Sequence, residues 1–91
     1  MSGAQYILPL QTSVKDLIKG EFSDRHPSTK SILRFFDYGH LPKELQGHSM
    51  TCAVLAVCMV HSTPDGPELT AGLRKLLEAK DCFVRANLPE E

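Results

Sequence analysis

Two groups of cationic and hydroxyl side chains carry the clearest chemical meaning in this sequence. Arg74 follows Thr70 by four positions, so on a helix the guanidinium and the hydroxyl share one face. Arg25, Ser28 and Lys30 flank an expected helix start, whose free amides attract anions. Guanidinium, ammonium and hydroxyl groups are the donors that phosphate oxygens accept. These groups are therefore candidate phosphate ligands, and the alternative interpretation is that both are solvated helix surface.

Metal binding and catalysis have weaker support in the sequence. His48 with Cys52, and Cys58 with His61, have the helical spacing that metal ligands use, but both pairs fall on one helix and lie too far apart along its axis to share an ion. We interpret these residues and Cys82 as structural, with reduced thiols. No Gly-rich phosphate loop and no nucleophile with an orienting partner is present. We expect a non-enzymatic protein without a metal or cofactor.

Composition limits the possible partners. The chain has 91 residues, with 10 Lys plus Arg against 11 Asp plus Glu, so it has no overall positive field to hold a long nucleic acid. The longest apolar run, Cys52 to Val60, is too short to span a bilayer, and the first residues do not resemble a secretory signal. We expect one intracellular domain over residues 1–91 with no membrane contact.

Helical periodicity and cap residues define the elements that must position these groups. A first helix is expected from Ser13 to Lys19 with Gly20 as its stop, followed by a polar loop from Glu21 to Pro27. Ser28 or Thr29 is expected to cap a second helix that ends at Gly39. The predicted fold class is all-α.

The second half of the chain predicts an antiparallel helix hairpin over approximately residues 42–88. Its first helix has Pro42 in the first turn and reaches His61. Asp65 and Glu68 have the spacing of a capping box, so the last helix is expected to begin near Gly66. The last helix carries an apolar stripe at intervals of three and four, formed by Leu69, Leu73, Leu76, Leu77, Phe83, Val84 and Leu88.

The helix expected over residues 42–61 is apolar on every side at its centre, CAVLAVCMV. A chain this short buries only roughly 60% of its unfolded surface, so it can hardly cover such a helix alone. Small helical proteins with thin cores commonly gain stability by association. The pattern therefore predicts an oligomer.

Two stretches of the chain resemble a known family. They are STKSILRFFDYGHLPKELQ, from Ser28 to Gln46, and PDGPELTAGLRKLLEAKDCFVRA, from Pro64 to Ala86. Their most specific parts are FFDYGHLP followed by LQ, and LRKLLEAKD followed by VRA. Together they look like the signature of the phage anti-CBASS type two cyclic-oligonucleotide sponges, whose helical hairpin is shared with anti-Thoeris sponges.

The resemblance implies a compact helical protomer, usually assembled as a hexamer in the host bacterial cytoplasm. It implies pockets between protomers that hold cyclic dinucleotides and, at separate sites, cyclic trinucleotides, without hydrolysing them. Binding would lower the free signal of the host CBASS defence. It favours Arg74, Thr70, Arg25, Ser28 and Lys30 as ligands, and Tyr6 is the nearest candidate for the aromatic residue that the family contributes from its N-terminal part. The rival hypothesis is a helical hairpin adaptor that binds a host protein through its apolar third helix.

Overall fold

The computed structural model describes residues 13–39 and 41–89, and the side chains of 44 and 45 are not described. The predicted all-helical class is confirmed, with 73% helix and no strand in the described part of the chain. The elements are α1 (Val14–Lys19), α2 (Pro27–Leu33), the 3-10 turn η1 (Arg34–Phe36), α3 (Lys43–Ser62) and α4 (Pro67–Ala86).

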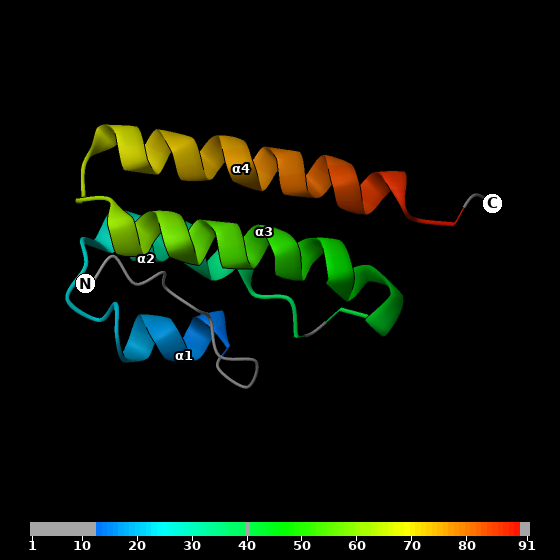
Figure 1. The fold of residues 1–91 in the computed structure, drawn as a ribbon, viewed down its shortest axis with the longest axis horizontal. Coiled ribbons are helices and arrows are strands. Elements are labelled where there is room, and N and C mark those ends of the chain that lie inside the picture. The colour runs from blue at the N-terminus through cyan, green and yellow to red at the C-terminus, as the bar shows by residue number, and fades with distance from the viewer. Residues whose placement is uncertain (1–12, 40, 90–91) are drawn as a thin grey trace, which may run out of the picture.

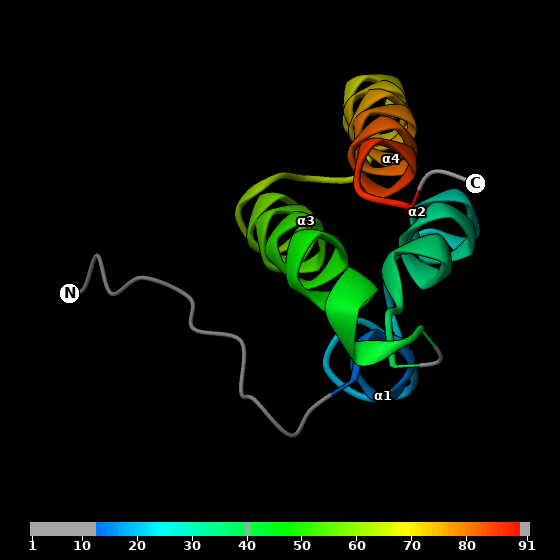
Figure 2. The same cartoon turned by 90° about the vertical axis from the view of Figure 1, so that its right-hand side faces the viewer.

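The helices lie around a shared core, with their axes close to the long direction of the molecule. Figure 1 shows α3 and α4 running alongside each other in opposite directions, joined by a short connection. Seen end-on in Figure 2, α3 and α2 lie between α4 and α1. The core contains aromatic and branched side chains from all five elements, among them Val14, Leu33, Phe36, Val57 and Leu73.

α1 begins and ends where the sequence predicts. The Ser13 hydroxyl accepts a hydrogen bond from the backbone N–H of Asp16 at 3.1 Å, which satisfies one of the free amides of the first turn. The Gly20 amide donates to the Asp16 carbonyl at 2.9 Å and closes the last turn. Val14 and Leu17 are the buried residues of this short helix.

The predicted cap of α2 is wrong. The N-cap is His26, whose ring accepts from the Ser28 amide at 3.1 Å, and Pro27 occupies the first turn, where its missing N–H costs nothing. Thr29, the other predicted cap, is buried inside the fold. The α-helix also ends earlier than Gly39, because the chain tightens into η1 and becomes extended at Asp37.

The other described elements cover α3 on one side only. Ala53, Ala56, Val57 and Val60 are fully buried, and their small or branched side chains let neighbouring helices approach closely. The opposite side, which we call the α3 apolar face, exposes 37–46% of each of its large apolar residues, which are Met50, Val54, Leu55 and Met59. The described residues therefore leave half of this apolar helix uncovered.

α4 begins at the predicted position, with Gly66 as its N-cap, but it differs from the prediction in its cap and in its second half. The capping box is wrong: the N-cap is Gly66, no side chain caps the helix, and the Asp65 carboxylate binds elsewhere. Leu69 and Leu73 are buried as expected, but Phe83 and Leu88 are about half exposed. The reason is visible in Figure 1, where α2 accompanies only the first part of α4. None of the helices in the described residues has the length and apolar character needed to cross a membrane.

Candidate functional site

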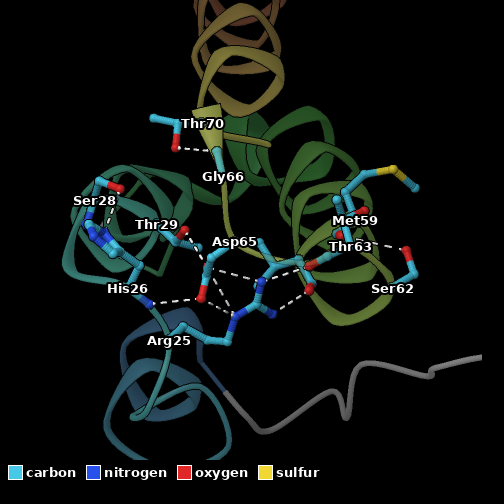
Figure 3. A network of polar contacts seen from close by, with 11 residues as sticks. Arg25, His26, Ser28, Thr29, Met59, Ser62, Thr63, Asp65, Gly66 and Thr70 are labelled. Atoms are coloured by element: carbon cyan, nitrogen blue, oxygen red, sulfur yellow. Dashed lines mark hydrogen bonds and ion pairs between the residues drawn. The ribbon is translucent and has the colours of Figure 1, made fainter. Parts of the chain in front are cut away.

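Arg25 joins the loop before α2 to the connection between α3 and α4 (Figure 3). Its Nη1 donates to the Val60 carbonyl, its Nη2 donates to the Thr63 carbonyl at 2.7 Å, and its Nε donates to the Asp65 carboxylate at 3.1 Å. The side chain is only 17% exposed. The guanidinium predicted to bind phosphate is thus engaged by the protein itself and satisfies the carbonyls at the end of α3.

Asp65 is the acceptor at the centre of the same network. Besides Arg25, it accepts from the Thr29 hydroxyl at 2.8 Å and from the His26 amide at 3.1 Å. These hydrogen bonds, first from the Arg25 side chain and then from Thr29, lower the pKa of Asp65 from 3.8 to about 2. The carboxylate is therefore ionised at neutral pH, and its charge is balanced by Arg25.

Replacing Asp65 with Asn should remove part of the acid sensitivity of the fold. Because the folded-state pKa is depressed, the stability contributed by the carboxylate is fully present above pH 3.8 and is lost as the pH falls towards about 2. We expect the free energy of unfolding of the parent to fall more steeply over this range than that of the variant. Urea titrations at stepped pH measure both slopes, and parallel slopes would show that Asp65 is not held by the network.

A pocket of about 330 Å³ lies beside this network, where the N-termini of α2 and α4 meet. It is lined by His26, Ser28, Asp65, Gly66, Pro67 and Thr70, and we call it the N-terminal pocket. Ser28 Oγ lies 2.9 Å from His26 Nδ1, and the Thr70 hydroxyl donates to the Gly66 carbonyl at 3.1 Å. The positive end of the α4 dipole points towards it, and no side chain caps that end.

Ser28 and Thr70 belong to the two separate groups that the sequence singled out, and the fold brings them to one pocket. Arg74 is exposed one turn beyond Thr70 and does not line this pocket. The ammonium of Lys30 donates to the Ser23 carbonyl at 2.8 Å, away from the pocket lining. Tyr6 lies outside the described residues.

The thiols occupy three different environments. Cys52 is buried, and burial raises the pKa of its thiol against the opposing effect of the Lys80 charge. Cys58 is half-buried. Cys82 is exposed and accepts from Arg85 Nη2 at 3.5 Å, so it is not part of the core. Within residues 13–39 and 41–89, no group of three or more His, Cys, Asp or Glu side chains is placed to hold a metal ion.

The molecule is thus a small helical protein with a polar pocket at two helix N-termini. Comparison with family models, curated proteins and solved structures finds no match to the chain.

Proposed function

We propose that the protein binds and sequesters cyclic di- and trinucleotides without hydrolysing them, and so blocks CBASS signalling in the host bacterial cytoplasm. The observation that carries the proposal is the convergence of Ser28 and Thr70 on the N-terminal pocket. The uncapped start of α4 offers backbone N–H donors to phosphate oxygens, and the Ser28 and Thr70 hydroxyls, now bonded to His26 and to the Gly66 carbonyl, would have to turn towards a phosphate to donate to it. The sequence resemblance to the anti-CBASS type two sponges supplies the ligand class.

The pocket alone is too small for a complete cyclic dinucleotide, so the proposal includes self-association. Arg74, exposed one turn beyond Thr70, is available to a ligand shared with a neighbouring protomer. When a near-symmetric ligand lies on a two-fold axis, each binding residue contacts it twice. We place the interface between hairpin protomers at the α3 apolar face, and the resemblance favours a hexamer. Burial of this face would complete the cover that residues 13–39 and 41–89 of one protomer leave open.

Replacing Leu55 with Asp should disrupt the assembly. Leu55 is 46% exposed on the α3 apolar face, so a charge there is tolerated in a protomer but is costly in an apolar interface. We expect the parent to have a multiple of the protomer mass, 10.1 kDa, and the variant to have a lower mass. Size exclusion with light scattering measures both. Lys75→Asp, which introduces the same carboxylate at an exposed position of α4, is the control and should leave the mass unchanged.

Calorimetric titration tests the ligand class. The titrants are cyclic dinucleotides, cyclic trinucleotides and the linear dinucleotides of matching base composition. The proposal predicts saturable binding of cyclic ligands and much weaker binding of linear ones, since a linear chain must lose more conformational freedom on binding. Equal affinity for cyclic and linear forms would contradict it.

The second candidate function is that of an adaptor that binds a host protein. It is favoured by the same α3 apolar face, because an exposed apolar patch on a small protein is typical of an interaction site. The two functions differ in their partner. A protein that stays a monomer and binds no cyclic nucleotide, with the α3 apolar face open, would favour the adaptor.

A further inference from the structure

A second polar pocket lies at the other end of the molecule from the Arg25 network. It has a volume of about 370 Å³ and is formed by residues around η1, by α3 and by the second half of α4. Cationic side chains reach it from two elements, Arg34 from η1 and Lys80 and Arg85 from α4. We call it the Lys80 pocket. It shares no lining residue with the N-terminal pocket.

Among the described residues, the cations of the Lys80 pocket form no ion pair. Lys80 is only 9% exposed, and its ammonium donates to the Phe35 carbonyl at 2.7 Å. Two carboxylates also line the pocket, those of Asp37 and Asp81. Among the described residues, no ion pair joins Arg34, Lys80 or Arg85 to any carboxylate. A buried ammonium without a counter-ion is costly, and an anion in the pocket would offset that cost.

The Ser49 hydroxyl is an independent sign of a ligand. Ser49 lines the Lys80 pocket and is completely buried, yet its hydroxyl has no hydrogen-bond partner among the described residues. Buried hydroxyls are nearly always paired, because an unpaired one has lost its water without compensation. A ligand oxygen in the pocket would complete this hydrogen bond.

We propose that the Lys80 pocket binds a sugar phosphate, either free or as part of a mononucleotide. The phosphate contacts Lys80, Arg85 and the Ser49 hydroxyl. Hydroxyls of the sugar donate to the carboxylates of Asp37 and Asp81. This role explains why the pocket is lined by acidic as well as cationic side chains. Phe35 lines the pocket and is 52% exposed. The Arg34 guanidinium lies 5.0 Å from the centre of its ring, so a base would stack on the part of the ring that Arg34 leaves exposed. The volume is at the small end of the range for ligand pockets, which suits a molecule of this size.

Sequence reasoning missed this site, although the sequence contains a signal for it. Lys80 falls seven positions after Leu73, on the apolar stripe of α4 rather than on its charged side. A cation on the buried side of an amphipathic helix needs a partner. Ser49 gives no comparable signal, since a small hydroxyl residue within a long helix is ordinary.

Titration followed by NMR tests the proposal, with ribose 5-phosphate, AMP and adenosine as probes. Both phosphates should shift the Ser49 amide and the Arg34 and Arg85 Nε–H signals saturably, and adenosine should not. If AMP binds more tightly than ribose 5-phosphate, the base contacts Phe35 and the ligand is a mononucleotide. If the two bind equally, the ligand is a sugar phosphate without a base. Absence of a saturable shift with either phosphate would overturn the proposal.

Two variants separate ligand binding from folding. Ser49→Ala removes an unpaired hydroxyl, so the melting temperature should stay the same or rise while phosphate affinity falls about tenfold or more. Arg85→Gln changes an exposed residue and should also weaken binding about tenfold. Lys75→Gln removes a charge from α4 outside the pocket and should leave affinity unchanged. Unchanged affinity in both pocket variants would contradict the proposal.

The same variants keep this proposal distinct from cyclic-nucleotide sequestration. Ser49→Ala and Arg85→Gln should still bind cyclic dinucleotides as the parent does, because the N-terminal pocket is elsewhere. If no cyclic nucleotide binds the parent protein, the proposed function fails. The titrations with ribose 5-phosphate and AMP still test the Lys80 pocket independently.

Discussion

Arg25→Met should lower the free energy of unfolding by about 3 kcal/mol, because it removes a largely buried guanidinium from two backbone carbonyls and from the Asp65 carboxylate, which would keep only the hydrogen bonds from Thr29 and the His26 amide. The guanidinium donates to the Val60 and Thr63 carbonyls and to the Asp65 carboxylate. These residues follow Arg25 by at least 35 positions in the sequence. Met keeps the aliphatic stem and removes only the donors. For a domain of this size the melting temperature should fall by roughly 15 °C.

Arg74→Met is the matched control for that measurement. Arg74 is exposed and makes no hydrogen bond or ion pair with another described residue, so its replacement should change the free energy of unfolding by less than about 0.5 kcal/mol. Urea denaturation of both variants gives the comparison. Equal small effects would mean that Arg25 is a solvated surface residue and that the connection between α3 and α4 is held by other contacts.

Arg74→Ala should weaken the binding of at least one class of cyclic nucleotide by about tenfold to more than a hundredfold, the usual cost of losing a charge-assisted contact. The residue lies one turn beyond Thr70 on the exposed side of α4, where it can contact a ligand held against a neighbouring protomer. Since the resemblance implies separate sites for the two ligand sizes, one class can be lost while the other is retained. Calorimetry with cyclic di- and trinucleotides measures both affinities.

Lys75→Ala controls for the general effect of removing one positive charge from α4 and should leave both affinities near those of the parent. If Arg74→Ala remains folded and oligomeric and binds every cyclic nucleotide as tightly as the parent, Arg74 is a solvated helix residue. Binding by Ser28 and Thr70 could persist in that case, and the site would then have to be completed by other residues.

Local signals predict the helices well where the cap residues act within one turn. Ser13 and Gly20 delimit α1, and the buried stripe of Leu69 and Leu73 marks the first half of α4. The start of α2 was misplaced because a histidine caps it, a role that Ser28 fulfils more commonly. The exposure of Phe83 and Leu88 cannot be predicted from the sequence, because periodicity shows which side of a helix is apolar but not how far the neighbouring helices extend.

The candidate sites depend on contacts between distant parts of the chain, which spacing cannot show. Asp65 has the spacing of a cap with Glu68, yet it binds Arg25, 40 residues earlier in the sequence. The contacts of Arg25 are likewise not predictable from the sequence, which does not reveal that the Val60 and Thr63 carbonyls lie within its reach. The convergence of Ser28 and Thr70 follows only once α2 and α4 are packed together.

Recovery of the bound molecule tests sequestration most directly. The protein is incubated with a mixture of cyclic di- and trinucleotides, separated from unbound ligand by size exclusion, heated to unfold it, and the released molecules are identified by mass spectrometry. Sequestration predicts that cyclic nucleotides of unchanged mass are released in a fixed ratio to protomer. Release of linear or shortened products, or of no nucleotide at all, would contradict it.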